Sequence, residues 1–341
     1  MKTLTVALLF GGQSNEHAIS CRSALTVLSA LQAGGYSVLP IGITNGGKWL
    51  LWRADPKGIA DPNWEHAPNL HPLTVAPDGW LYTHEGRAYH VDVAFPILHG
   101  QGGEDGKVQG FLHYWGVPYV GCGVEASALS MNKILAKRLV KEAGVPTLPW
   151  RYCTPNTAPE ELSPHLPLFI KAVRSGSSLG AAAAHTEAQL PSALSQALSV
   201  DGEALAEPFF RAKEIEVAVF DDGDRTVSMP AEIETSSDFY DFDTKYVSGT
   251  TRAYLPARLD EEQTALVRKY ASLVFDTLGC RHLSRVDFFV SNEHIYFNEI
   301  NTMPGFTPDS LYPRMMDRAG LDLPTLASRL VEAALHDWHL R

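Results

Sequence analysis

Cysteine is scarce in this sequence. The four cysteines, Cys21, Cys122, Cys153 and Cys280, lie far apart and show no CxxC spacing. A disulfide-stapled fold or a zinc-thiolate site needs paired or closely spaced cysteines, so this distribution argues against both. We therefore expect reduced thiols in a cytoplasmic protein.

Positive charge and long apolar runs are also lacking. The chain has 28 Lys and Arg against 39 Asp and Glu, a formal net charge of −11. Surfaces that bind nucleic acid or anionic membranes need basic patches, so neither partner is expected. No run of 18 apolar residues is present to cross a bilayer. The apolar N-terminal run breaks at Gly11-Gly12 without a small-x-small cleavage site, which predicts a buried strand rather than a signal peptide.

Two common nucleotide-binding motifs are absent or incomplete. Gly11-Gly12 does not extend to GxGxxG, so a dinucleotide site is not expected. Residues 42–48 have the glycine and lysine spacing of a P-loop, but Trp49 stands where Ser or Thr would bind Mg²⁺, and no helix is predicted to follow. We interpret this segment as a turn.

The elements that are present predict an α/β (α+β) fold with several units in 341 residues. Residues 1–121 are expected to form an N-terminal α/β substrate-binding domain. Its predicted elements are a strand at 4–10, a helix at 18–33, and strands at 37–43 and 91–98. Residues 53–78 are rich in Pro, Asp, Asn and Trp, and we expect an irregular insertion there.

Two further units follow, a central one at residues 122–209 and a C-terminal one at residues 210–341. Their predicted elements are a helix at 129–143, strands at 168–171 and 215–220, a helix at 261–278, a hairpin, and a terminal helix at 323–335. Residues 236–252 are polar and aromatic without a calcium-loop pattern, which suits a mobile lid over an active site.

The most informative segment is the predicted hairpin at residues 285–305. Asp287 shares a face with Arg285, and Glu299 shares a face with Asn301, because strand side chains alternate. With a five-residue loop, Asp287 lies directly opposite Glu299. Two carboxylates and an amide form a hard oxygen-ligand site that suits Mg²⁺ or Mn²⁺. The alternative is an exposed acidic face, in which the opposed carboxylates would repel each other.

Two lysines and a Gly/Ser loop are candidates for holding nucleotide phosphates. Lys133 lies on the first turns of a helix, and Lys171 ends a strand just before residues 174–180. The backbone N–H groups of such a loop can cradle phosphate oxygens. The alternative is a pair of solvated lysines.

Glu207, Phe209 and Phe210 join the central unit to the C-terminal unit. A carboxylate that accepts from an adenine amino group, beside an aromatic ring that stacks, suits a purine slot between domains. A linker with buried phenylalanines is the alternative.

Two polar stretches follow predicted strands of the first unit, Glu16-His17 and the loop at residues 99–106. Ligands of parallel α/β sheets dock at the carboxyl ends of strands, so both stretches are candidates for substrate binding. A capping role at the helix start is the alternative for Glu16-His17.

In this order the motifs resemble the D-alanine–D-alanine ligase family of the ATP-grasp superfamily. The matching stretches span nearly the whole chain: Gly11-Gly-x-Ser14-x-Glu16-His17-x-x-Ser20, His99-Gly-x-Gly-Gly-Glu-Asp-Gly106, Met131-Asn-Lys133, Lys171-x-x-Arg-x-Gly-Ser177-Ser178-x-Gly180, Lys245-Tyr246, Arg285-x-Asp287 and Asn298-Glu-x-Asn301-Thr-x-Pro-Gly305. The resemblance implies an ATP-grasp fold, in which an N-terminal parallel α/β domain precedes two α+β domains that clasp ATP. It also implies ATP-dependent ligation of two D-alanines through a D-alanyl phosphate, for peptidoglycan synthesis.

The resemblance implies a role for each residue on the nucleotide side. Two Mg²⁺ or Mn²⁺ ions would be held by Asp287, Glu299 and Asn301, with Glu299 bridging them. ATP would be bound by Lys133, Lys171 and Ser178 at the phosphates, by Glu207, Phe209 and Phe210 at adenine, and by Glu214 at the ribose.

On the substrate side, the resemblance places Glu16 at the ammonium of the first D-alanine, with His99 nearby. Arg285 and the backbone N–H of Gly305 would stabilise the oxyanion. Ser310 and the Leu311 N–H would fix the second carboxylate, and Lys245 would lie near both phosphate and substrate. Glu16, Ser177 and Tyr246 resemble a hydrogen-bonded set that orients the second substrate and ties down the lid.

Two positions bear on specificity and on alternatives. Related depsipeptide ligases have His where this chain has Tyr246, so Tyr246 favours an amine nucleophile over D-lactate. Ser175 stands where many relatives have Glu, which leaves the details of that loop open.

The alternatives are another ATP-grasp carboxylate–amine ligase, such as a D-alanine–D-lactate ligase, and a non-catalytic nucleotide-binding regulator. The family also implies a homodimer.

Overall fold

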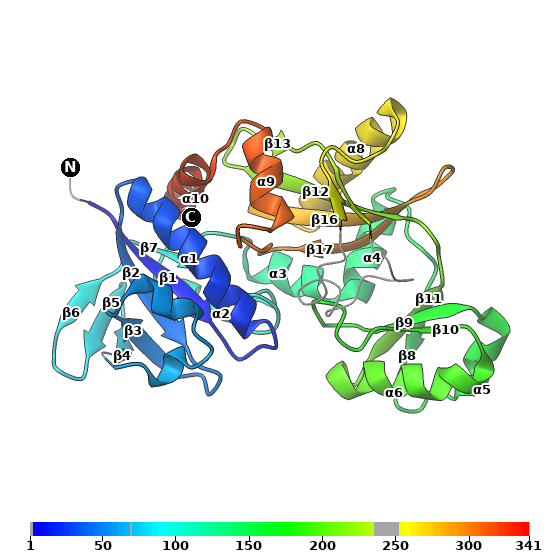
Figure 1. Cartoon of the computed structure of the whole chain (residues 1–341), viewed down its shortest axis with the longest axis horizontal. Helices are drawn as coiled ribbons and strands as arrows, with labels where there is room; N and C mark the ends of the chain where they lie inside the picture. Colours follow the sequence, from blue (N-terminus) through cyan, green and yellow to red (C-terminus); the bar gives the residue numbers. More distant parts are fainter. Residues whose placement is uncertain (1–2, 69, 235–251, 341) are drawn as a thin grey trace.

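The computed structural model describes residues 3–68, 70–234 and 252–340, which form three β-sheets. In Figure 1 the first sheet lies at the left, the second at the lower right, and the third above and between them. Helices cover the sheets, and the mixture of parallel and antiparallel strands confirms the predicted α/β (α+β) class. Among the described residues, no helix is both long and apolar enough to cross a membrane.

The first sheet has the strand order β6-β5-β4-β3-β2-β1-β7. Its strands are β1 (Thr5–Gly11), β2 (Ser37–Ile43), β3 (Trp49–Trp52), β4 (Leu70–Ala76), β5 (Trp80–Thr83), β6 (Ala88–His90) and β7 (Val93–Pro96). β1 pairs in parallel with β2 and β7, and α1 (His17–Ala33) connects β1 to β2, as the predicted βαβ unit requires. β1 is buried on both faces, because alternate residues pack against α1 and against α2 (Lys107–Trp115). This explains its unbroken apolar sequence.

The first sheet is mixed, because β3 to β6 extend it in antiparallel pairs. Residues 53–78, which we predicted to be irregular, contain two 3-10 helices, η1 (Pro56–Ala60) and η2 (Trp64–His66), and strand β4. The prediction was wrong for β4 because His71 and Pro72 weaken its strand signal.

The second sheet has the order β10-β9-β11-β8 and is wholly antiparallel. Its strands are β8 (Arg151–Cys153), β9 (Leu168–Ala172), β10 (Ala182–Ala184) and β11 (Ala204–Pro208), and its helical elements are α5 (Pro159–Leu162), η3 (Ser163–His165), η4 (Glu187–Gln189) and α6 (Leu190–Asp201). The apolar side of α6 packs on β9 and β10 and closes a small separate core.

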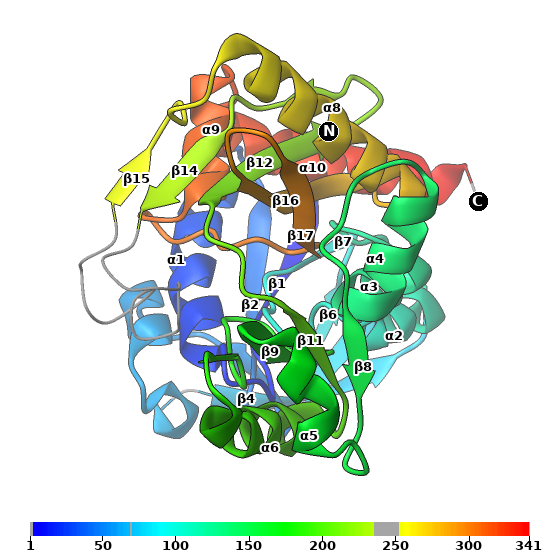
Figure 2. The ribbon, with the colours of Figure 1, turned by 90° about the vertical axis from the view of Figure 1, so that its right-hand side faces the viewer.

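The third sheet has the order β15-β14-β12-β16-β17, with β13 paired to β12. Its strands are β12 (Lys213–Asp221), β13 (Thr226–Val227), β14 (Ala231–Glu234), β15 (Arg252–Tyr254), β16 (His282–Val290) and β17 (Ile295–Asn301). Helices α3 (Val124–Met131), α4 (Lys133–Glu142), α8 (Glu261–Thr277), α9 (Leu311–Arg318) and α10 (Leu323–His339) surround it. Figure 2 shows this sheet lying across from strands β9 and β11 of the second sheet.

The helix predicted at residues 129–143 is two helices. Asn132 separates α3 from α4, and its side-chain Oδ1 accepts from the backbone N–H groups of Ile134 and Leu135. This N-cap makes Lys133 the first residue of α4. The cap therefore fixes the direction in which the Lys133 side chain leaves the helix.

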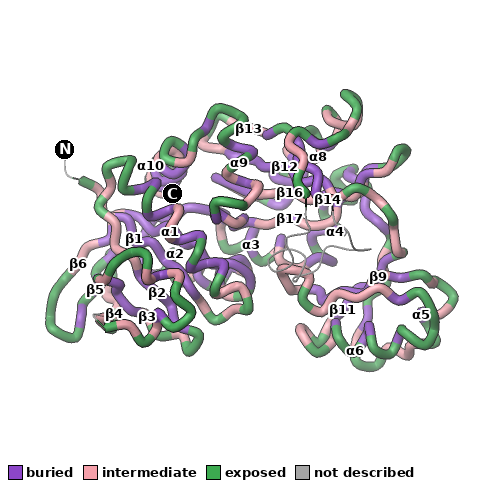
Figure 3. The backbone as a smooth tube through the Cα atoms, in the orientation of Figure 1, coloured by how far each residue is buried: buried purple, intermediate pink, exposed green. Residues whose placement is uncertain are grey.

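The two faces of β12 have different surroundings. Val217 and Val219 face a core with α4 and α8, while Ala218 and Phe220 face α9 and α10 in the core that also includes α1. Glu214 and Glu216 lie on that second face nearer the start of the strand. Figure 3 shows the central strands of the sheets as buried tubes.

Candidate active site

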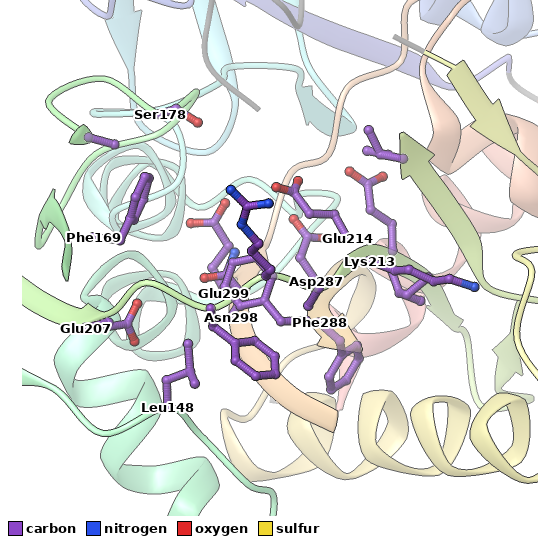
Figure 4. A pocket seen from close by; sticks show the side chains of 18 of the residues that line it. Leu148, Phe169, Ser178, Glu207, Lys213, Glu214, Asp287, Phe288, Asn298 and Glu299 are labelled. Atoms are coloured by element: carbon purple, nitrogen blue, oxygen red, sulfur yellow. The ribbon is translucent and has the colours of Figure 1, made fainter. Parts of the chain in front are cut away.

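A cleft of about 490 Å³ lies between the second and third sheets, within the range of nucleotide-sized pockets. Its walls include side chains from α4, β9, β11, β12, β16 and β17: Lys133, Phe169, Lys171, Glu207, Glu214, Glu216, Asp287, Asn298 and Glu299. Figure 4 shows Glu214, Asp287 and Glu299 together on one side, with Phe169 and Ser178 across from them. The predicted phosphate and adenine residues, and the predicted metal residues Asp287 and Glu299, thus line a single cleft.

The hairpin pairs Asp287 with Glu299, as predicted, but its loop is shorter than the five residues that this pairing was expected to need. Its loop has four residues, 291–294, and a β-bulge follows Asp287, so that Phe288 pairs with Phe297 whereas Asp287 pairs with Glu299. The extra residue is Asn298. A bulge places two consecutive side chains on nearly the same face, and here Asn298 and Glu299 both line the cleft. Without the bulge, the apolar residue Phe297 and the acidic residue Glu299 would lie on the same face of the strand.

Three carboxylates lie in one row across the third sheet. Glu216 pairs with Asp287, and Asp287 pairs with Glu299. Arg285, in the next row, donates from Nε and Nη2 to both oxygens of Asp287 at 2.8 and 2.7 Å, and its Nε lies 3.2 Å from Glu216 Oε2. The Asn301 amide donates to Asp287 at 3.2 Å. Our sequence prediction missed Glu216, although its alternation with Glu214 on a predicted strand was a usable signal.

The two predicted phosphate lysines are both buried and paired. Lys133 Nζ lies 3.2 Å from Glu299 Oε2 and donates to the Ser175 carbonyl at 2.6 Å. Lys171 Nζ donates to Asn298 Oδ1 at 2.9 Å and lies 2.7 Å from Glu207 Oε2. These contacts contradict the alternative of two solvated lysines.

Glu207 lies between two lysines at the back of the cleft. Besides Lys171, it pairs with Lys137 of α4, whose Nζ lies 2.7 Å from Glu207 Oε1. Burial alone would raise the pKa of Glu207, but the two lysines outweigh it and hold that pKa below its usual value. Burial also lowers the pKa of Lys137 to about 8, against the attraction of Glu207. Lys137 falls within the helix predicted at residues 129–143, and no role was predicted for it.

Aromatic rings surround the outer end of the cleft. Phe209 and Phe210 both line it; the ring of Phe209 lies edge-on to His185, and that of Phe210 lies edge-on to Tyr296. Phe169 of β9 adds a third ring. Glu214 also faces the cleft, as predicted. Phe169 was missed because a phenylalanine inside a buried strand has no sequence feature that separates it from the core.

A second cavity of about 220 Å³ adjoins the cleft and shares Glu216 and Glu299 with it. The predicted substrate residues line it together: Glu16, His99, Ser177, Arg285, Gly305, Ser310 and Leu311. Ser310 Oγ accepts from the Thr307 N–H at 3.0 Å, and Leu311 is the first residue of α9, whose N-terminal N–H groups can bind a carboxylate.

Glu16 does not cap the helix that follows it. It stands at the N-cap position of α1, but its side chain makes no capping hydrogen bond and accepts instead from Ser177 Oγ, across the boundary between the first and central units. Ser177 and Ser178 both have positive φ, 49° and 57°, which turns the loop towards Glu16. The structure thus contradicts the capping alternative.

His99 is buried behind the second cavity. Its Nδ1 lies 2.9 Å from the Met303 carbonyl and its Nε2 lies 3.1 Å from Ser23 Oγ, which in turn accepts from the Phe306 N–H. Burial lowers the pKa of His99, while the nearby Glu16 opposes this effect. A neutral His99 that donates from Nδ1 satisfies both contacts. His99 therefore holds the backbone on either side of Gly305.

Glu104 is a buried carboxyl group that sequence reasoning placed in a motif but gave no role. Its Oε1 accepts from the Gly100 N–H at 3.0 Å and its Oε2 from the Met303 N–H at 3.2 Å, which joins two loops of the second cavity. Burial raises its pKa to about 8, and the negative charge of Glu16 adds to the effect.

The raised pKa of Glu104 predicts a pH dependence of stability. Between pH 4.5, its ordinary pKa, and about 8, the folded protein keeps a proton that the unfolded chain loses. The contribution of Glu104 to the free energy of unfolding therefore falls as pH rises through this window. Urea unfolding between pH 5 and 8 should show a shallower decline for Glu104→Gln than for the natural chain. The exposed Glu125→Gln is the control, and equal slopes for all three proteins would contradict the prediction.

The near match to a P-loop at residues 42–48 is a turn, as predicted. The Thr44 N–H donates to the Lys48 carbonyl, and antiparallel β3 follows rather than a helix. A Cβ on Gly42 would lie 2.3 Å from the ring of Trp64, so this glycine makes room for a buried tryptophan. Trp64 Nε1 also donates to His17 Nε2 at 2.9 Å. His17 thus supports the loop beside Glu16.

Lys245 and Tyr246, and all of the predicted lid at residues 236–252 except Arg252, lie outside the described residues. Their roles stay predictions from the sequence. The remaining predicted site residues all line the cleft or the second cavity. Asn301 lines the second cavity and a small third one.

Three sheets with a nucleotide-sized cleft between the last two, bordered by lysines and a carboxylate hairpin, define an ATP-grasp ligase. Residues 5–122 match the family model "D-ala D-ala ligase N-terminus", and residues 139–332 match "D-ala D-ala ligase C-terminus". The chain belongs to the D-alanine–D-alanine ligase family.

Individual relatives agree with this family over the full length. A D-alanine–D-alanine ligase of Chlorobium phaeovibrioides is 41% identical, with 98% of each chain covered. Among solved structures, a D-Ala:D-Ser ligase from Enterococcus faecalis matches with a TM-score of 0.88 at 35% identity, covering 98% of this chain and 100% of that chain. The D-alanine–D-alanine ligase from Coxiella burnetii matches with a TM-score of 0.88 at 32% identity, covering 100% and 96%.

Proposed function

We propose that this chain joins two D-alanine molecules to D-alanyl-D-alanine at the expense of ATP. The carboxylate of the first D-alanine attacks the γ-phosphoryl group, which gives a D-alanyl phosphate and ADP. The amine of the second D-alanine then attacks the acyl carbon, and inorganic phosphate leaves. The observation that carries this proposal is the contact between the two cavities: the lysine-lined cleft and the smaller pocket share Glu216 and Glu299. A phosphoryl group bound at this junction lies within reach of a carboxylate in the smaller pocket.

The cleft suits ATP along its whole length. Glu207 and the rings of Phe209 and Phe210 would receive adenine, and Glu214 would accept from the ribose hydroxyls. Lys133 and Lys171 would bind phosphate oxygens, with Ser178 closing over them. Lysine serves here as a point charge that phosphates attract strongly. The cost of burying both lysines is offset before ATP binds by their present carboxylate partners.

Asp287, Glu299 and Asn301 would hold two Mg²⁺ or Mn²⁺ ions. Two carboxylates and an amide oxygen are the hard donors that these ions prefer, with water and phosphate completing the shell. Within the described parts of the chain, no group of three or more His, Cys, Asp and Glu side chains is arranged to hold a metal ion. When bound, such ions neutralise the phosphate charge during transfer.

The smaller pocket suits two amino acids. Glu16 would accept from the ammonium group of the first D-alanine, with His99 supporting the wall behind it. Arg285 and the Gly305 N–H would donate to the oxyanion of the tetrahedral intermediate. For the second D-alanine, the carboxylate would be fixed by Ser310 and the Leu311 N–H. We further propose that Ser177, Tyr246 and Lys245 orient this substrate once the lid is closed.

The remaining proposals concern the protein as a whole. We propose three functional units, at residues 1–121, 122–209 and 210–341, with the lid at residues 236–252. We also propose that the protein works in the cytoplasm as a homodimer and supplies D-alanyl-D-alanine for peptidoglycan synthesis and hence for cell shape.

The test is ADP release with D-alanine, L-alanine, D-lactate or D-serine as co-substrate, with mass analysis of each product. We expect ADP release that depends on D-alanine, a product of two D-alanines, and loss of activity with EDTA that Mg²⁺ or Mn²⁺ restores. ADP release that is equal without D-alanine would favour a different ligase. No ADP release with any co-substrate, despite ATP binding, would favour the non-catalytic alternative. If a depsipeptide or a D-Ala-D-Ser product forms in preference, the second substrate is D-lactate or D-serine rather than D-alanine.

A further inference from the structure

Lys137 is a fully buried lysine that lines neither cavity. It lies one turn after Lys133 on α4, and its side chain has no exposed surface. Its Nζ lies 2.7 Å from Glu207 Oε1 and donates to the Phe297 carbonyl at 3.2 Å. The residue therefore stands behind the cleft, between the strand that bears Glu207 and the strand that bears Glu299.

Complete burial of a lysine needs a physical reason. A charged amine taken out of water costs several kcal/mol, and an apolar side chain of similar volume would often leave the protein equally stable. Glu207 does not need Lys137 to be paired in this structure, because Lys171 already lies 2.7 Å from its other oxygen. Glu207 needs the second lysine when the first one is drawn elsewhere.

Lys171 is the partner that ATP would draw away. It lines the cleft and also donates to Asn298, whereas Lys137 does not line the cleft and pairs with the other oxygen of Glu207. A phosphate beside Lys171 would compete with Glu207 for its charge. Glu207 would then be a buried carboxylate, 1% exposed, with Lys137 as its remaining cation.

We propose that Lys137 is a positioning residue for ATP: it holds Glu207 charged and in place, so that Lys171 is free to bind phosphate while Glu207 binds the adenine amino group. This inference rests on the proposed function of the cleft. The proposal differs from a role in packing alone, in which Lys137 would merely tie α4 to β17 through the Phe297 carbonyl.

The experiment compares Lys137→Met with Lys137→Arg, and uses Lys141→Met as a control, an exposed lysine on the same helix. Initial rates of nucleoside diphosphate release are measured with ATP, which gives ADP, and with ITP, which gives IDP and lacks the amino group that Glu207 would accept from. We expect Lys137→Met to raise the KM for ATP about tenfold, as for a weakened charged hydrogen bond, with kcat changed less than about threefold. The preference of the Lys137→Met protein for ATP over ITP should fall by a similar factor. In Lys137→Arg, the KM for ATP and this preference should both return most of the way to their natural values.

Several results would overturn the proposal. In a folded Lys137→Met protein, an unchanged KM for ATP or an unchanged ATP-to-ITP preference would do so. Equal changes in kcat and in the KM values of both substrates would show a structural role instead. Lys141→Met should match the natural chain in every constant.

A double variant still tests the proposal if Lys137→Met fails to fold. Lys137→Met combined with Glu207→Gln removes one buried positive and one buried negative charge together, and Lys171 keeps Asn298 Oδ1 as an acceptor, so this protein should fold. If Lys137 acts through Glu207, the double variant should have the same KM for ATP as Glu207→Gln alone. An added increase would contradict the proposal.

Failure of the proposed function is distinguishable from failure of this inference. If the natural chain releases no ADP with D-alanine, the proposed function is wrong. The same variants are then compared by direct titration with ATP and ITP, where the expected tenfold loss and the loss of base preference are unchanged.

Discussion

Arg285→Met should lower kcat for dipeptide synthesis by about 10²- to 10³-fold, the effect expected when one oxyanion donor is removed. Arg285 is the cation between the acidic row and the smaller pocket, and it is held by Asp287 at 2.7 and 2.8 Å and by Glu216 at 3.2 Å. This fixed orientation is what makes the guanidinium effective, because little rearrangement is needed as charge develops on the substrate oxygen.

The same substitution should also destabilise the protein. Removal of Arg285 leaves Asp287 and Glu216 without the cation between them, and breaking such a largely buried pair costs up to about 3–5 kcal/mol. Steady-state kinetics combined with urea unfolding separates the two effects. Arg285→Lys is the matched control, because it retains the charge but loses the two-point contact with Asp287. We expect Arg285→Lys to recover stability more than activity. A folded Arg285→Met protein with kcat within tenfold of the natural value would contradict the oxyanion role.

Trp64→Ala should lower the free energy of unfolding by about 3–5 kcal/mol, as for other fully buried large aromatic residues. The ring is 1% exposed, lies 5.1 Å from the ring of Phe10 and 6.3 Å from that of Trp52, and donates to His17. Its removal would leave a cavity beside Gly42 and an imidazole without its donor.

The matched control is Trp80→Ala, because Trp80 is 40% exposed on β5 of the same sheet. We expect that change to cost less than about 1 kcal/mol. Chemical unfolding followed by circular dichroism measures both variants without relying on tryptophan emission. Similar losses for the two variants would mean that the insertion around Trp64 is not part of the core.

The site was largely predictable from the sequence because its residues lie in short motifs with strong local signals. The hairpin is an example: alternation on two apolar strands placed Arg285, Asp287 and Glu299 on the correct faces. The bulge was not predictable, because it arises from a conflict between strands. The core needs Phe297 beside Phe288, while the site needs Glu299 beside Asp287, and only an extra residue satisfies both.

The role of Lys137 was missed because it depends on a partner far along the chain. Lys137 and Glu207 are 70 positions apart, so neither local propensity nor spacing reveals their contact. Strand β4 was missed for a different reason: its Pro72 is compatible with the sheet only because tertiary pairing with β3 overrides its weak propensity.

The packing of α10 on α1 has a consequence for synthesis of the chain. Leu326, Leu330 and Val331 of this last helix share a core with Val27 and Leu31 of the first helix, and Figure 1 shows the two helices side by side. While the chain emerges from the ribosome, β1 can cover part of the apolar side of α1, but the part that contacts α10 stays uncovered until residues 323–339 are made. The first unit therefore lacks part of its core until α10 has been made. A nascent chain halted near residue 320 should still be sensitive to protease in its first 120 residues.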